Sequence, residues 1–182
     1  MEEESLLEEL IRYQPHDELE GAHVAATVNF MQEHDDCFQR SNLHGHITGS
    51  GWIINPEQSH CLLVHHRKLN RWLQPGGHAD GNDNIMEVAR MEVMEETGLE
   101  EFIIIPGIFD VDVHRIPARK SDPEHYHFDI RYLFLAETRA QLRISEESNA
   151  LQWIPMDKLH MYTDGEASMM RLLEKSHLFN HV

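Results

Sequence analysis

The chain has 182 residues, enough for one domain with a sizeable core, and its hydrophobic content of 41% is ordinary for a globular protein. A formal net charge of −17 disfavours general attraction to a nucleic-acid polymer or an anionic membrane. No apolar run is long enough to span a bilayer, and the acidic start MEEESLLEEL does not resemble a signal peptide. Cys37 and Cys61 have no metal-ligand or redox spacing, so we expect two free thiols in a cytoplasmic protein.

The hydrophobic pattern predicts two N-terminal helices, then short strands with one helix between them and another at the end. The helices are expected at 4–12, 17–38, 84–97 and 165–179. The strand segments are expected at 46–54, 61–66, 72–78, 102–116, 125–137 and 151–155. This order indicates an α/β fold, with a mixed sheet packed by helices on its faces.

The third predicted helix carries three glutamates whose direction matters. Successive helical residues advance by about 100°, so Glu92, Glu95 and Glu96 fall in the same sector as the apolar Ile85 and Val88. We therefore expect these carboxylates to continue the inward-facing stripe and not to lie on the solvated face. The simpler alternative is a charged, frayed helix end, but it does not explain the shared sector.

Three partly desolvated carboxylates repel one another unless basic side chains or a divalent cation lie between them. The helix has no lysine or arginine in that sector, and Arg90 points away from it. Oxygen ligands at this spacing suit Mg²⁺ or Mn²⁺. The helix therefore predicts a site for one of these ions.

The stretch GHADGNDNIMEVARMEVMEETGL, residues 77–99, resembles the Nudix box of the Nudix hydrolase superfamily. That box is a glycine, five residues, a glutamate, seven residues, then Arg-Glu-apolar-any-Glu-Glu-any-Gly-apolar. The directly matching positions are Gly77, Glu92, Val93, Glu95, Glu96, Gly98 and Leu99. Asp83 stands in place of the first glutamate, and Met91 in place of the arginine.

The resemblance extends over roughly 45–175 and implies a Nudix-type α/β/α sandwich with a mixed sheet over 43–182. Residues 1–42 then form an N-terminal helical extension. The implied activity is metal-dependent hydrolysis of a pyrophosphate bond in a nucleoside diphosphate linked to another group, with Mg²⁺ or Mn²⁺ as cofactor. The implied partner is a small nucleotide-type substrate, with no nucleic-acid polymer and no membrane.

The resemblance also implies roles for single residues. Glu92, Glu95 and Glu96 match the family's metal ligands, and Gly77 matches a position whose backbone carbonyl joins the metal shell, in what we expect to be a tight glycine turn. The first candidates for the catalytic base are Glu92 and Glu96. Some members carry the base on a later loop instead, where the sequence SEESN offers Glu147 or its neighbour Glu146, although the sequence favours a solvated turn for this stretch.

Met91 sets this chain apart from the pattern. The family arginine donates hydrogen bonds to the neighbouring carboxylates, which a thioether cannot do, and losing such a partner costs about 10–100-fold in metal affinity or activity. A weakened enzyme is the leading hypothesis. The second is a catalytically weak module that binds or senses a nucleotide-type ligand. The third is an acidic scaffold protein that forms a homodimer through its N-terminal helices and whose metal is purely structural.

Two strand segments carry polar side chains at alternate positions. The residues that share such faces are Asp110, Asp112, His114, His125, His127, Asp129 and Arg131. If the strands pair antiparallel, the two faces meet. Three interpretations stay open: a substrate pocket using His114, His127 and Arg131, a solvated sheet face, and an imidazole-rich zinc site.

A local basic cluster precedes the predicted metal turn. Arg67, Lys68 and Arg71 are the only grouped cations in this part of an acidic chain. Arg67 and Arg71 are therefore candidates for binding substrate phosphate, although exposed loop charges are commonly just solvated.

Overall fold

The computed structural model describes residues 5–119 and 123–179. The chain forms two compact units, the first comprising Met1–Ser50, Gly76–Ala89 and Gly107–Tyr132, and the second Gly51–Pro75, Arg90–Pro106 and Leu133–Val182. Strands β1 (Gly45–Ile54) and β7 (His125–Leu135) and helix α3 (Ile85–Thr97) each run from the first unit into the second.

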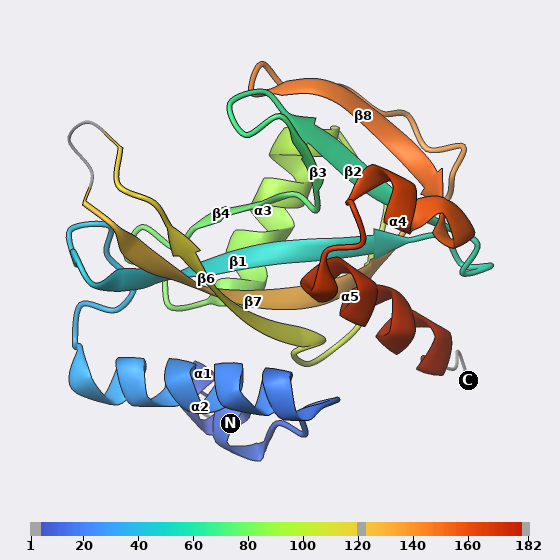
Figure 1. Cartoon of the computed structure of the whole chain (residues 1–182). Helices are drawn as coiled ribbons and strands as arrows, with labels where there is room; N and C mark the ends of the chain where they lie inside the picture. Colours follow the sequence, from blue (N-terminus) through green and yellow to red (C-terminus); the bar gives the residue numbers. More distant parts are fainter. Residues whose placement is uncertain (1–4, 120–122, 180–182) are drawn as a thin grey trace. The chain divides into compact units, whose positions relative to one another are not determined.

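The remaining elements, labelled in Figure 1, each belong to one of the two units. Those of the first unit are α1 (Leu6–Arg12), α2 (Glu18–Glu33), β4 (Gly76–His78) and β6 (Asp110–Ile116). Those of the second unit are β2 (His60–His66), β3 (Arg71–Leu73), β5 (Ile103–Ile104), β8 (Ser148–Pro155), the 3₁₀ turn η1 (Met156–Lys158), α4 (Leu159–Tyr162) and α5 (Ala167–Leu178).

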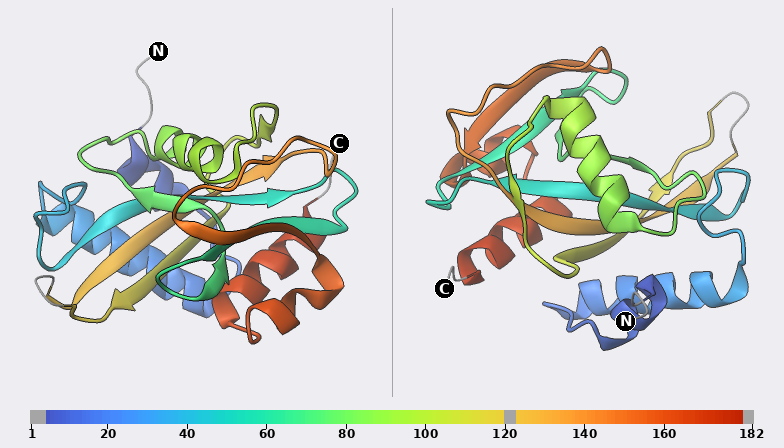
Figure 2. Two further views of the ribbon diagram at one scale, coloured as in Figure 1. Left: turned by 90° about the horizontal axis from the view of Figure 1, so that it is seen from above. Right: turned by 180° about the vertical axis from the view of Figure 1, so that it is seen from behind.

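The strands form one sheet in the order β3-β2-β1-β7-β5, with β4 also paired to β1, β6 to β7 and β8 to β2. In the second unit, β8 lies beside β2 along its whole length (Figure 2). Trp52 of β1 is fully buried there, and its indole N–H donates to Ser176 Oγ of α5 at 2.7 Å. None of the helices in the described part of the chain has the length and apolar character needed to cross a bilayer.

The N-terminal helices are fixed to β6 by a buried carboxylate. Glu20 of α2 has no exposed surface and accepts hydrogen bonds from Tyr13 Oη at 2.6 Å and from the backbone N–H of Val111 at 3.2 Å. The second helix was predicted to reach residue 38 but ends at Glu33. Beyond it, Asp36 accepts from the Asn42 amide at 2.7 Å, and such local side-chain bonds compete with helix continuation.

Helix α3 packs closely on β1 because β1 carries glycines where the two meet (Figure 2). A Cβ at Gly49 would lie 2.9 Å from the carbonyl oxygen of Ile85, and one at Gly51 would collide with the side chain of Val93. Glycine at these two positions lets the helix approach the strand. Both glycines therefore lie on the face of β1 that contacts α3.

One predicted strand is wrong, one short helix was missed, and the expectation for the cysteines is confirmed. The segment 72–78 was expected to be one strand ending in a glycine turn, but it forms the end of β3 and then β4, which pairs with β1 through Gly76–His78. The short helix α4 was not predicted, because four residues are too few to show a periodicity. Cys37 and Cys61 are both free, as expected, and both are buried.

Candidate functional site

Helix α3 has the boundaries that its sequence predicts. Asn84 Oδ1 accepts a hydrogen bond from the backbone N–H of Glu87 at 3.0 Å, which caps the first turn. Gly98 has φ +71°, and this left-handed conformation ends the helix. The turns of α3 that carry the three glutamates therefore lie between the Asn84 cap and the terminating Gly98.

The three box glutamates of α3 differ in exposure. Glu92 and Glu96 are half-buried, whereas Glu95 is exposed. The prediction that all three face inward is therefore wrong for Glu95, which lies at the edge of the apolar stripe near the end of the helix. Positions i, i+3 and i+4 remain neighbours on a helix surface, with Cβ atoms about 5–6 Å apart, so the carboxylates can still act on one ion.

Residues around the glutamates follow the expected directions. Met91 is 45% exposed, so its thioether is not packed against the core. Arg90 Nη1 lies 2.9 Å from Met94 Sδ, one turn further along the helix. The Arg90 guanidinium therefore lies along the Met94 side of α3, in agreement with the prediction that Arg90 points away from the glutamate sector.

Gly77 lies in β4, opposite Gly49 of β1, and not in the turn that was expected. The turn prediction failed because the paired glycines read as a loop signal, while in the structure they allow close strand pairing. A Cβ on the adjacent Gly76 would collide with the Ser50 side chain. Small residues at this point keep β4 against β1.

The predicted phosphate-binding arginines and the alternative base are all exposed, and all belong to the second unit. Arg67 bonds Asn149 Oδ1 at 3.3 Å and the Ser148 carbonyl at 3.4 Å. Arg71 forms an ion pair with Glu166. Glu147 lies just before β8, and its carbonyl accepts from the backbone N–H of Arg67 at 2.9 Å.

The polar faces of β6 and β7 meet, as antiparallel pairing requires. Asp110 pairs with Arg131, Asp112 with Asp129, and His114 with His127. The first four of these side chains are buried, so this part of the surface is not the solvated face that was one interpretation. The strand alternation was predicted correctly, but the burial was not.

Arg131 is enclosed by three aspartates, and we call these four residues the aspartate–arginine cluster. Its Nε lies 2.8 Å from Asp129, and its Nη1 and Nη2 lie 3.2 Å from Asp110 and Asp112 respectively. Burial alone would lower the pKa of Arg131, but the three carboxylates outweigh that effect and raise it above its usual value. Arg131 was predicted to bind substrate, and the structure instead commits its guanidinium to an internal network.

Five histidines gather at the other end of the same strands, and we call them the imidazole cluster: His46, His78, His114, His125 and His127. The ring centroid of His46 lies 4.9 Å from that of His78, 5.0 Å from that of His125 and 4.8 Å from that of His127. The ring of His114 lies 5.4 Å from that of His127. Sequence reasoning included three of these residues but missed His46 and His78, which come from β1 and β4.

The cluster favours neutral imidazoles. Burial, reinforced by the neighbouring imidazoles and, for His78, by Arg40, lowers the pKa of His127 to about 2 and that of His78 to about 4. Burial likewise lowers the pKa of His46. At neutral pH these rings therefore keep a nitrogen lone pair that can accept a hydrogen bond or bind a metal.

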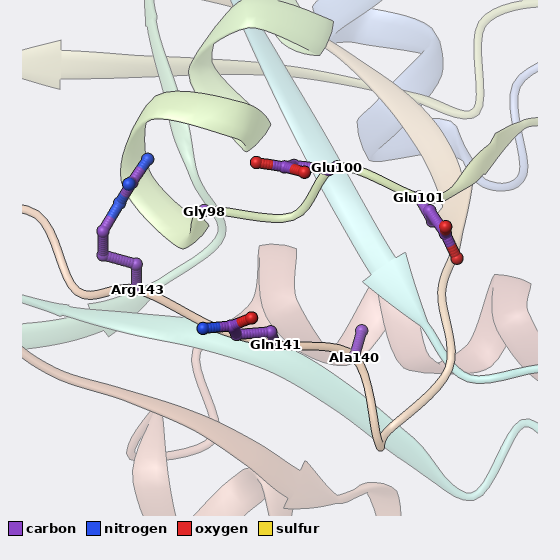
Figure 3. Close-up of a pocket in the computed structure, with 6 residues that line it drawn as sticks. All are labelled: Gly98, Glu100, Glu101, Ala140, Gln141 and Arg143. Carbon is purple, nitrogen blue, oxygen red and sulfur yellow. The ribbon is translucent and has the colours of Figure 1, made fainter.

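A separate hollow of about 370 Å³ lies in the second unit, between the end of α3 and the segment that precedes β8 (Figure 3). The residues that line it are Gly98, Glu100, Glu101, Ala140, Gln141 and Arg143. Small-molecule sites are lined mainly by apolar and aromatic side chains, whereas four of these six residues are polar or charged. This hollow therefore does not identify a ligand site.

Comparison with known proteins decides the family. A family model described as the NUDIX domain matches residues 45–175, which is most of the chain. The chain belongs to the Nudix family. Its fold is the Nudix-type sandwich of a curled sheet and helices, and membership places it among the pyrophosphate-cleaving Nudix hydrolases.

Among curated relatives, the rat bis(5'-nucleosyl)-tetraphosphatase [asymmetrical] is 29% identical over 132 residues, covering 70% of this chain and 84% of the relative. A Caenorhabditis elegans Ap4A hydrolase structure superposes with a TM-score of 0.60 at 19% identity, covering 73% of this chain and 96% of that one. A NUDIX-family hydrolase from Clostridium perfringens gives a TM-score of 0.56 at 23% identity, over 76% and 99% of the two chains. At these identities the solved structures support the fold alone.

Proposed function

We propose that this protein is a metal-dependent Nudix hydrolase that cleaves a pyrophosphate bond in a nucleoside diphosphate linked to another group. The observation that carries the proposal is the set Glu92, Glu95 and Glu96 at i, i+3 and i+4 on α3, inside the segment that matches the family model. The relatives named as tetraphosphatases support dinucleoside polyphosphates as the first substrates to test.

The donor set fits a hard divalent ion. Adjacent carboxylates on one helix supply the oxygen ligands that Mg²⁺ and Mn²⁺ prefer, and the family pattern adds the Gly77 carbonyl as a further oxygen. When bound, such an ion offsets phosphate charge and makes water a better nucleophile. We propose Mg²⁺ or Mn²⁺ as the cofactor.

The chain's own residues supply the remaining chemistry. Glu92 or Glu96 accepts the proton of the water that attacks phosphorus, while the bond to the leaving phosphate breaks. Glu147, exposed before β8, remains the alternative base.

Substrate contacts are proposed from exposed cations and imidazoles. Arg67 and Arg71 are exposed near β3 and can reorient toward phosphate, and His114 is 44% exposed. Arg131 is left out of this set because its guanidinium is committed to the aspartate–arginine cluster. We further propose 43–182 as the catalytic domain and 1–42 as its extension, which the family match beginning at residue 45 supports.

A substrate panel tests the proposal. We expect the protein to cleave a phosphate anhydride bond in a diadenosine tetraphosphate, a nucleoside diphosphate sugar or a nucleoside triphosphate when Mg²⁺ or Mn²⁺ is present. Chromatography of the nucleotide products measures this cleavage. Addition of a chelator should abolish it. The second candidate function, a ligand-sensing module, is favoured by Met91 and would give saturable ligand binding with no turnover at any metal concentration.

The Met91→Arg variant provides a prediction about the missing donor. Because Met91 is 45% exposed, arginine fits there without disturbing the core, and its guanidinium can reach the neighbouring carboxylates. We expect kcat/KM to rise by about 10–100-fold, measured on the best substrate of the panel. Met86→Arg, at another exposed methionine of α3, is the control for adding a charge to this helix. An unchanged rate in Met91→Arg would mean that another group already supports the glutamates.

A further inference from the structure

Three histidines of the imidazole cluster already converge on one point. His46 of β1 and His125 and His127 of β7 each present a ligand atom within 4.8 Å of those of the other two. The ring of His78 on β4 lies 4.9 Å from the rings of both His46 and His127. Because all four residues lie on paired strands of the first unit, the backbone holds the rings in place.

His46 is a buried histidine whose ring nitrogens make no hydrogen bond to any of the described residues. The residue is only 4% exposed, and in the described part of the chain neither its Nδ1 nor its Nε2 makes a hydrogen bond. The backbone of Asn42 lies near the ring, but no contact between the two meets hydrogen-bond geometry. Buried polar groups are nearly always satisfied, so an imidazole left without a partner indicates a missing ligand.

His125 is oriented as a metal-binding histidine would be. Its Nδ1 lies 2.9 Å from the carbonyl oxygen of Pro123, and a carbonyl only accepts, so Nδ1 carries the proton. The neutral ring therefore has its lone pair on Nε2, which lies 3.3 Å from Nε2 of His127. A carbonyl that fixes the tautomer of a ligating histidine from behind is the usual arrangement in metal sites.

We propose that His46, His125 and His127 form a metal site for Zn²⁺ or a similar transition-metal ion, with His78 as the fourth candidate ligand. Imidazole nitrogen is a preferred ligand of these ions, whereas Mg²⁺ takes oxygen ligands. Zinc–nitrogen bonds of about 2.0–2.1 Å in a tetrahedron place neighbouring nitrogens about 3.3 Å apart. The separation of the two Nε2 atoms already has this value.

The site differs from the carboxylate site of α3 in both position and chemistry. Along β1, Gly49 lies on the face that contacts Ile85 of α3, and His46 occupies an alternate position with Thr48 and Ser50 on the other face. Its donors are nitrogens and those of α3 are oxygens. The proposal therefore stands whether or not the protein hydrolyses a pyrophosphate.

The proposed site is tested by measuring metal binding to the protein prepared without an affinity tag. After chelator treatment and dialysis, the protein should take up one equivalent of Zn²⁺ by isothermal titration calorimetry. Co²⁺ in its place should give the strong visible absorption of a tetrahedral complex. His125→Gln and His127→Gln should each weaken Zn²⁺ binding by about 100-fold or more, since even loss of an outer-shell partner costs 10–100-fold.

Two further variants locate the binding. His177→Gln removes an exposed histidine of α5 and should leave Zn²⁺ affinity unchanged. Glu96→Gln, in the carboxylate site, should also leave the tight equivalent in place. Retention of full Zn²⁺ affinity in both His125→Gln and His127→Gln would overturn the proposal, as would loss of the tight equivalent in Glu96→Gln alone. Circular dichroism of each variant verifies that the fold is intact.

Discussion

Replacing Glu96 or Glu92 by glutamine should lower kcat by about 100-fold or more. Glutamine has nearly the same shape but carries no charge, so the variant keeps the helix and loses one anionic ligand and one proton acceptor. Loss of a residue that merely supports a metal ligand costs about 10–100-fold, and loss of the ligand itself should cost at least as much. The measurement is steady-state hydrolysis of the best substrate across a Mg²⁺ titration.

Exposure distinguishes the three glutamates within this experiment. Glu95 is exposed, so water can replace its carboxylate more easily than those of the half-buried Glu92 and Glu96. We expect Glu95→Gln mainly to raise the Mg²⁺ concentration needed for half-maximal rate, with much of kcat restored at high Mg²⁺. Glu100→Gln, an equal charge change at an exposed position just after the helix, is the matched control and should behave as wild type. If Glu92→Gln and Glu96→Gln both kept kcat within threefold of wild type, α3 would not hold the catalytic metal.

The parts of the site that the sequence predicted are those set by local chemistry. Helix α3 begins at an Asn84 cap and ends at Gly98, and both signals act within one turn. Strand alternation likewise placed His114 and His127 on faces that meet in the β6–β7 register. In both cases the information lies within a few residues of the feature it determines.

The parts that sequence reasoning missed depend on long-range pairing. His46 joins the imidazole cluster only because β1 lies where its ring can meet those of His125 and His127, and no local pattern encodes that approach. The strand alternation placed Arg131 on a polar face but did not reveal how deeply that face is buried. In the structure His23 of α2 lies 3.3 Å from Asp112, so a helix from the N-terminal segment contributes to that cover.

Arg131→Met should lower the free energy of unfolding by about 3–5 kcal/mol, because it leaves buried carboxylates without their cation. Arg131 and its three aspartates are almost entirely buried, and Asp129 also accepts from Thr48 and Ser50, so the network cannot easily move toward water. At about 2–4 °C per kcal/mol for a chain of this size, the melting temperature should fall by roughly 6–20 °C. Urea denaturation followed by circular dichroism measures the free energy directly.

An exposed ion pair formed by Arg115 of the neighbouring strand β6 separates the effect of burial from that of charge. Arg115 lies 3.1 Å from Glu124, with side chains 61% and 49% exposed, and such pairs contribute about 0–1 kcal/mol. Arg115→Met should therefore leave the free energy of unfolding within about 1 kcal/mol of wild type. If Arg131→Met were equally mild and instead raised KM for the substrate, Arg131 would be a phosphate ligand, as its strand position first suggested. A large loss of stability in Arg131→Met alone would assign the aspartate–arginine cluster to the core of the fold, which holds β6 and β7 in the register that also aligns His114 with His127.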